Sequence, residues 1–219
     1  MSQGHMSQVW AALPVKERAG AKQRLAGVLT PEQRRALATA MLEDVLAALA
    51  AAPLAGILVN TLDPDAAALA RRHGAVVMTE GARDGHTGAV AAMARRLAAD
   101  GRAAMLALPG DLPLLTAAEI AALCAAAAPA PSFTIAPSRD ALGSNGVLLT
   151  PPLCVTLRFG EDSFFPHLAA ARAVGIEPTI MRLPGFGLDI DTPEDLAELR
   201  AASPAGRVGP VLRGFALAG

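Results

Sequence analysis

The central part of the chain reads Leu106-Ala-Leu-Pro-Gly-Asp-Leu-Pro-Leu-Leu115. Its apolar residues predict a buried strand that ends at Pro109-Gly110, and the carboxylate of Asp111 follows directly. In open α/β sheets ligands bind beyond the carboxyl ends of the strands, so Asp111 is a candidate ligand-binding residue. On this stretch alone, a solvated aspartate in an ordinary strand-to-helix turn is an equally good interpretation.

Composition restricts the class of protein. With 219 residues, of which 53% are hydrophobic, the chain can bury the core of one domain. Aromatic residues make up only 3% and the net charge is -1, which argues against base stacking and against nucleic-acid binding. The alanine-rich runs are too short to cross a membrane, and we expect a cytoplasmic protein. Cys124 and Cys154 are far apart in sequence and suggest neither a zinc site nor a disulfide framework.

Strand and helix patterns alternate along the chain, which predicts an α/β fold with a largely parallel sheet. A polar loop is predicted over 137–146 between two strands that would form an antiparallel excursion. A further loop is predicted over 81–88, with a helix from Ala89 to Ala99, and Ser163 is expected to cap another helix. We expect one domain over residues 6–202, a cloning scar over 1–5 and a loose C-terminal extension over 203–219.

A cluster of cations follows the first predicted strand, Val9 to Val15. Lys16, Lys22 and Arg24 lie in a short segment with one glycine. A solvated basic loop is the plainer interpretation, and a triphosphate-binding loop is the functional one. The pattern GxxxxGK[ST] is absent, which excludes a P-loop.

Two further acids, Asp189 and Asp191, flank Ile190 in a segment that we expect to be an extended strand. Residues i and i+2 of a strand share one face, about 6.6 Å apart. Together with Asp111 they would form an oxygen-only site suited to Mg²⁺. A magnesium ion and a cationic loop can clamp a nucleoside triphosphate for phosphoryl or nucleotidyl transfer.

The four histidines do not form part of an evident Ser-His-Asp set. His73, His86 and His167 are scattered along the chain, and we expect each to be a surface or helix-end residue rather than a general base. A phosphate-bearing acceptor brings an ionised nucleophile, so nucleotidyl transfer to such an acceptor needs no general base.

Five segments carry a resemblance to a known family. They are Pro14-Val-Lys16 with Ala21-Lys22-Gln-Arg24-Leu25, Pro109-Gly-Asp111-Leu-Pro113, Ser138-Arg-Asp with Gly143-Ser144-Asn145, Arg158-Phe-Gly160 with Ser163 and His167, and Leu188-Asp-Ile-Asp191-Thr-Pro-Glu-Asp-Leu196. In this order they resemble the guanylyltransferases of coenzyme F420 biosynthesis (the CofC/FbiD family), from Val9 to about Leu199.

The resemblance implies a single-domain nucleotidyltransferase fold, GT-A-like and Rossmann-like, in a three-layer sandwich with a mixed, mostly parallel sheet. It implies transfer of GMP from GTP to 2-phospholactate, phosphoenolpyruvate or 3-phosphoglycerate, with release of pyrophosphate. The implied catalytic residues are Lys22, Arg24 and Asp111. The implied Mg²⁺ ligands are Asp111, Asp189 and Asp191. The implied nucleotide-binding residues are Pro14, Val15, Lys16, Lys22, Thr87 and Gly88. The implied acceptor-binding residues are Ser144, Asn145, Gly160 and Ser163.

The chain departs from the family at Gly85-His86-Thr87-Gly88-Ala89, where a Gly-Leu-Asn-like segment is usual. Thr87 is the candidate substitute for the absent asparagine, and the identity of the nucleotide stays open. Two alternatives remain: a related enzyme that uses another nucleotide with a sugar or cofactor phosphate, and a non-catalytic nucleotide-binding protein. The acceptor and a homodimeric state are also left open.

Overall fold

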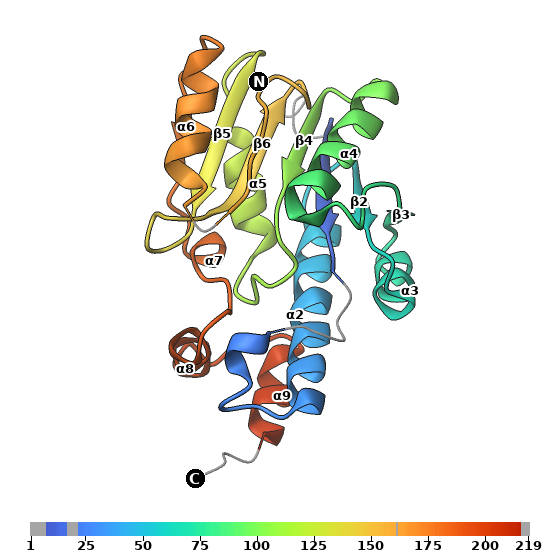
Figure 1. The fold of residues 1–219 in the computed structure, drawn as a ribbon, viewed down its shortest axis with the longest axis vertical. Helices are drawn as coiled ribbons and strands as arrows, with labels where there is room; N and C mark the ends of the chain where they lie inside the picture. The colour runs from blue at the N-terminus through green and yellow to red at the C-terminus, as the bar shows by residue number, and fades with distance from the viewer. Residues whose placement is uncertain (1–7, 17–21, 161, 216–219) are drawn as a thin grey trace.

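The computed structural model describes residues 8–16, 22–160 and 162–215 (Figure 1). A seven-stranded sheet lies at the centre of this part, in the order β3-β2-β1-β4-β6-β5-β7. Its strands are β1 (Val9–Pro14), β2 (Gly56–Asn60), β3 (Val76–Met78), β4 (Ala104–Ala107), β5 (Ser132–Pro137), β6 (Ser144–Thr150) and β7 (Thr179–Ile180). Only β6 runs antiparallel to its neighbours among these strands, so the predicted mixed, mostly parallel sheet with an antiparallel excursion is confirmed.

Helices cover both faces of the sheet, which confirms the three-layer sandwich. One face packs against α2 (Pro31–Ala51), α3 (Pro64–Arg72), α5 (Ala117–Ala125) and the short α7 (Pro184–Gly187); the other packs against α4 (Gly85–Ala99) and α6 (Phe164–Ala173). Alternate residues of one strand enter opposite layers, as the pleat requires. In β4, Leu106 packs on the first face and Met105 on the second.

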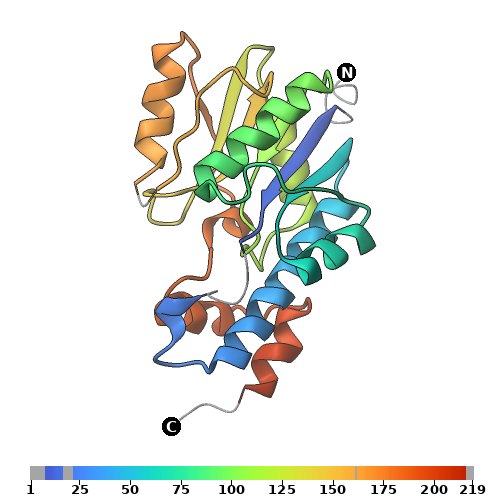
Figure 2. The same cartoon turned by 45° about the vertical axis from the view of Figure 1, so that its right-hand side comes forward.

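A third hydrophobic cluster lies beyond one end of the sheet. It joins the N-terminal part of α2 to the 3-10 helix η2 (Gln23–Leu25), α8 (Pro193–Ala201) and α9 (Val208–Gly214). Figure 2 shows these elements gathered below the sheet, with α9 alongside α2. The expectation of a loose C-terminal extension is therefore wrong for residues up to 215, because Val208 and Leu212 are buried in this cluster.

Several helix starts follow the predicted capping chemistry. Thr30 with Gln33 and Thr192 with Asp195 both form complete capping boxes. Ser163 is the N-cap residue of α6, as expected, but its side chain makes no capping hydrogen bond.

Three other boundaries differ from the prediction. Helix α4 begins at Gly85 and includes half of the segment expected as a loop. Strand β6 begins at Ser144, which takes Ser144 and Asn145 out of the predicted polar loop. Asp189 and Asp191 lie in a connection between α7 and α8 and not in a strand.

The start of α9 depends on a carboxylate from another helix. Asp44 of α2 accepts hydrogen bonds from the backbone N–H groups of Arg207 (2.6 Å) and Val208 (3.0 Å). We expect Asp44→Ala to lower the free energy of unfolding by about 1 kcal/mol, the usual loss for a helix cap. Urea denaturation measures this change.

The adjacent Glu43 provides a matched control. Its carboxylate contacts the exposed guanidinium of Arg207 at 3.3 Å, and such pairs contribute from about 0 to 1 kcal/mol. Glu43→Ala should therefore cost less than Asp44→Ala. An Asp44→Ala variant as stable as wild type would show that α9 does not depend on this cap.

Candidate active site

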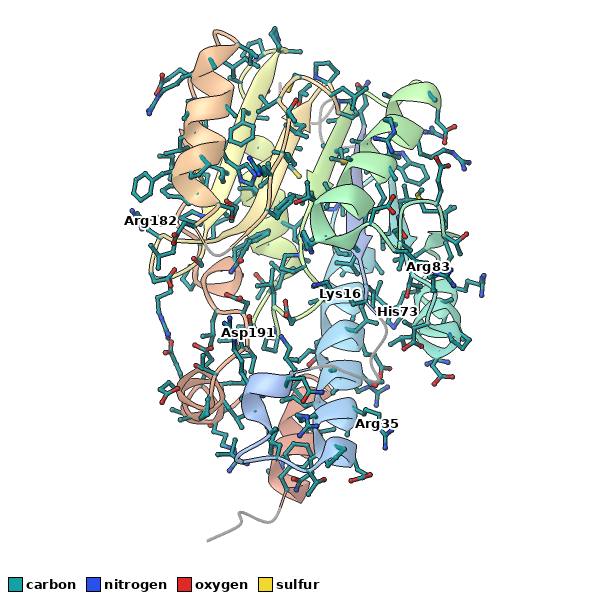
Figure 3. The ribbon with its side chains drawn as sticks, in the orientation of Figure 1. Lys16, Arg35, His73, Arg83, Arg182 and Asp191 are labelled. Carbon is teal, nitrogen blue, oxygen red and sulfur yellow. The ribbon has the colours of Figure 1, made fainter. Side chains whose placement is uncertain are left out.

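A cavity of about 1090 Å³ opens where β1 and β4 end. Twelve of the fourteen predicted site residues line it: Pro14, Val15, Lys16, Lys22, Arg24, Asp111, Ser144, Asn145, Gly160, Ser163, Asp189 and Asp191. Thr87 and Gly88 are not in the lining, so their contact with a nucleotide stays a prediction. In Figure 3, Lys16 and Asp191 lie beneath the same end of the sheet, although they come from opposite ends of the chain. Residues 17–21 of the predicted cationic loop lie outside the described part.

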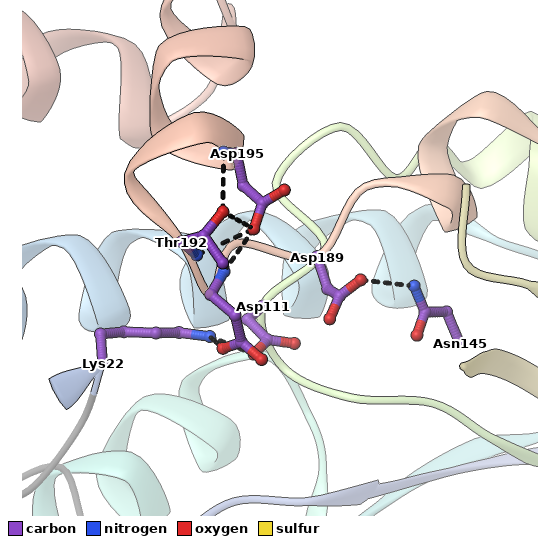
Figure 4. A network of polar contacts seen from close by, with 7 residues as sticks. Lys22, Asp111, Asn145, Asp189, Thr192 and Asp195 are labelled. Carbon is purple, nitrogen blue, oxygen red and sulfur yellow. Dashed lines mark hydrogen bonds and ion pairs between the residues drawn. The ribbon is translucent and has the colours of Figure 1, made fainter. Parts of the chain in front are cut away.

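Lys22 joins two of the predicted acids (Figure 4). Its Nζ donates to Asp111 Oδ2 and, at 2.9 Å, to Asp191 Oδ1. Burial by itself would lower the pKa of Lys22, but the two carboxylates outweigh it and raise the pKa. The backbone of Lys22 is left-handed (φ 54°, ψ 45°), a conformation that non-glycine residues adopt at an energetic cost. The lysine therefore places a positive charge between the two acids.

Asp189 lines the same cavity, where Asn145 holds its carboxylate. Asn145 Nδ2 donates to Asp189 Oδ1 and to the carbonyl oxygen of Phe186, both at 2.9 Å. The pKa of Asp189 is raised, first by burial and then by the negative charges of Asp111 and Asp191, against the lowering effect of the Asn145 hydrogen bond. The three carboxylates thus converge closely enough to influence one another, as the sequence predicted.

The connection that carries Asp189 and Asp191 keeps the alternation expected of a strand without pairing in the sheet. Ile190 between them is fully buried in the third hydrophobic cluster, together with Leu188. Asp195 Oδ2 accepts from the backbone N–H of Asp191 at 3.1 Å. Side-chain packing and a helix cap therefore orient the two acids in place of a strand ladder.

The three carboxylates have the chemistry to bind a hard cation, but their side chains do not already surround a common metal position. Carboxylate oxygens are the ligands that Mg²⁺ prefers, and Asp111 Oδ1 is buried with no hydrogen-bond partner in the described part of the chain. Among residues 8–16, 22–160 and 162–215, no three acid, histidine or cysteine side chains already form a metal-binding group. Lys22 lies between Asp111 and Asp191, where it supplies the positive charge.

Two of the predicted acceptor residues, Ser144 and Ser163, contact each other in the cavity lining. Ser144 Oγ lies 3.3 Å from Ser163 Oγ and 2.9 Å from His167 Nδ1. His167 lies in the first turn of α6, a helix-end position as expected, but it is only 1% exposed and is not a surface residue. No local sequence signal pointed to the contact between His167 and Ser144, because the two residues lie 23 positions apart in the chain.

The cavity lining also includes residues that were not among the predicted site residues, and His86 and Arg139 are two that carry ionisable side chains. His86 lies in the first turn of α4, a helix-end position as expected, and burial together with the charge of Lys16 lowers its pKa to about 4. Arg139 also lines the cavity, where its guanidinium contacts Asp195 and Glu198. The Ser138-Arg-Asp segment contributes to the family resemblance, which implies no role for the arginine.

Comparison with solved structures shows the fold. The chain matches a structure described as a nucleotide-diphospho-sugar transferase from Desulfovibrio desulfuricans G20, with a TM-score of 0.75 at 19% identity, over 95% of each chain. The fold is nucleotidyltransferase-like, as the resemblance implied.

Sequence comparison then gives the family. The family model "Guanylyl transferase CofC like" matches residues 9–203. The phosphoenolpyruvate guanylyltransferase of Rubrobacter xylanophilus is 41% identical over 89% of this chain and 94% of its own length. The 2-phospho-L-lactate guanylyltransferase of Methanothermobacter thermautotrophicus is 33% identical, over 86% and 82%. The chain belongs to the CofC guanylyltransferase family, as the resemblance predicted.

The raised pKa of Asp189 predicts how the stability of the metal-free protein depends on pH. An acid whose pKa is higher in the folded state favours folding when protonated, and this contribution is lost as pH rises through the folded-state pKa. In EDTA, Asp189→Asn should therefore be more stable than wild type at pH 7. The difference should disappear as pH falls to about 3.9, the ordinary pKa of aspartate. Thermal unfolding across this pH range measures it.

Asp191→Asn is the matched control for this pH series. The carboxylate of Asp191 accepts a hydrogen bond from Lys22, so its removal leaves the lysine short of a partner and should not stabilise the protein. If Asp189→Asn were no more stable than wild type at pH 7, ionised Asp189 would not be the unfavourable charge described above.

Proposed function

We propose that this chain transfers GMP from GTP to a small three-carbon phospho-acid, with phosphoenolpyruvate as the first candidate, in coenzyme F420 biosynthesis. An oxygen of the acceptor phosphate attacks the α-phosphorus of GTP, the bond from that phosphorus to the oxygen bridging to the β-phosphate breaks, and pyrophosphate leaves. The observation that carries the proposal is the contact of Lys22 with Asp111 and Asp191 in the cavity of a CofC family member. The name and 41% identity of the Rubrobacter relative support the choice of acceptor.

The acids are proposed to hold Mg²⁺, which when bound would supply charge neutralisation at the α-phosphate. Asp111, Asp189 and Asp191 are the candidate ligands, and this role is supported by Asp111 Oδ1, which has no hydrogen-bond partner among the described residues. Lys22 would exchange its carboxylate partners for the triphosphate, next to Arg24 and Lys16. This exchange lets one lysine stabilise the empty site and bind the substrate.

The two substrates would bind to different residues of the cavity. Pro14, Val15, Thr87 and Gly88 are proposed to bind the nucleotide, from the end of β1 and the first turn of α4. The acceptor would lie near Ser144 and Ser163, whose hydroxyl groups suit an anion. A cytoplasmic location and a homodimer stay predictions.

An acceptor panel tests the reaction. The protein is incubated with GTP, Mg²⁺ and, separately, phosphoenolpyruvate, 2-phospholactate or 3-phosphoglycerate, and pyrophosphate release is measured. We expect turnover with phosphoenolpyruvate, and none when Mg²⁺ is removed by EDTA. Replacing GTP by CTP, ATP or UTP tests the nucleotide. No release with any acceptor would contradict the proposal, and binding of GTP without turnover would favour a non-catalytic role.

Asp111→Asn tests the central acid at nearly constant shape. We expect kcat/KM to fall by at least about 100-fold, the usual loss when an electrostatic contact to the transition state is removed. Asp100→Asn is the control, because Asp100 ends α4 outside the cavity lining and contacts Arg96. Near-wild-type turnover by Asp111→Asn would remove Asp111 from the reaction.

A further inference from the structure

His167 has both ring nitrogens engaged, which fixes its tautomer. The backbone N–H of Arg158 can only donate, and it lies 2.9 Å from Nε2, so Nε2 is the acceptor. Burial lowers the pKa of His167 to about 4, so the ring is neutral at pH 7 and carries its hydrogen on Nδ1. That hydrogen must point at Ser144 Oγ, 2.9 Å away.

In the part of the chain that the structure describes, one hydroxyl hydrogen of the Ser144–Ser163 pair has no acceptor. The pair has two O–H hydrogens, and the single contact between the two oxygens, at 3.3 Å, uses one of them. Because His167 donates to Ser144, the other hydrogen cannot be given to the imidazole. Both serines are buried, at 7% and 4% exposure, and both line the cavity. The free hydrogen is therefore available to an acceptor group within the cavity.

We propose that His167 is a positioning residue for the acceptor substrate: its Nδ1–H fixes the Ser144–Ser163 pair as a hydrogen-bond donor to the acceptor's carboxylate or phosphate. This inference rests on the proposed function, and it adds a residue outside the predicted acceptor set. His167 touches neither substrate and acts through Ser144. Were Nε2 protonated instead, the Nε2–H and the Arg158 N–H would face each other, and Ser144 would donate to the ring.

The same histidine also holds the backbone next to the serine pair. Its Nε2 accepts from Arg158, and Thr87 Oγ1 accepts from the next backbone N–H, that of Phe159, at 3.0 Å. The ring of Phe159 packs edge-on against His167, with centroids 5.0 Å apart. These contacts fix the segment that leads to Gly160, itself part of the cavity lining. One buried side chain thus positions a hydroxyl pair and a backbone segment at the same end of the cavity.

The tautomer is testable without any enzyme activity. Long-range ¹H–¹⁵N correlation spectra of the ¹⁵N-labelled protein at pH 7 distinguish the two neutral tautomers and the charged ring. The His167 signals are those absent from a His167→Gln variant. We expect the Nδ1–H tautomer, and an Nε2–H tautomer or a charged ring would overturn the proposal.

The effect on the acceptor is tested by a double-mutant cycle. A glutamine at 167 can place its amide oxygen near Nε2 for Arg158, but it loses the donor to Ser144. His167→Gln should raise KM for phosphoenolpyruvate about tenfold, the usual effect of a hydrogen bond to a charged group, with KM for GTP unchanged. In a Ser144→Ala background the same change should leave the acceptor KM unaltered, because the hydroxyl on which it acts is gone.

His167→Asn separates positioning from simple stability, because its amide N–H falls near Nδ1 and restores the donor. We expect its KM for phosphoenolpyruvate to be closer to wild type than that of His167→Gln. Additive effects in the cycle, or an equal rise in KM for GTP, would overturn the proposal. A wild-type protein without turnover would instead contradict the proposed function and the acceptor role with it, while the spectra would still decide the direction of the hydrogen bonds.

Discussion

Convergence of negative charge is the constraint on which the site depends. Three carboxylates brought into one partly buried cavity repel one another, and the pKa of Asp189 is raised first by burial and then by the charges of Asp111 and Asp191. Lys22 offsets this repulsion by contacting the other two acids. Three converging carboxylates need a counter-charge, and Lys22 supplies it. The lysine side chain must move away from the acids if a cation is to bind there.

The fold brings these charges together through hydrophobic anchors placed next to them. Leu25 follows the Lys22 segment, and Ile190 lies between Asp189 and Asp191; both are fully buried in the third cluster beyond the sheet. Leu112, directly after Asp111, packs in the core on one face of the sheet. Each charged residue is therefore held at the edge of the cavity by an apolar neighbour. Substitutions in the third cluster should therefore change the positions of the acids, even though no cluster residue needs to contact a substrate.

The sequence was informative where the signal was local. Asp111 was placed correctly because a short apolar run followed by Pro-Gly specifies a strand end. Asp189 and Asp191 were correctly predicted to point toward the same site, but they were assigned to a strand. The alternation of acid and buried residue is the same in a strand and in a loop that Ile190 anchors. Helix α9 was missed because its segment contains glycine and proline, and its start is satisfied by Asp44 from another helix. The role of His167 could not be predicted, because it arises from Ser144, which only the fold brings next to it.

The central claim is that the charged cavity directs attack at the α-phosphorus of GTP by an acceptor phosphate. Phosphorus NMR of the reaction with GTP, Mg²⁺ and phosphoenolpyruvate tests it most directly. The account predicts two new, mutually coupled phosphorus signals from a diphosphate bridge between guanosine and the acceptor, together with an equal amount of pyrophosphate. Formation of GDP with inorganic phosphate or a phosphorylated acceptor would place the reaction at the γ-phosphorus and contradict the account.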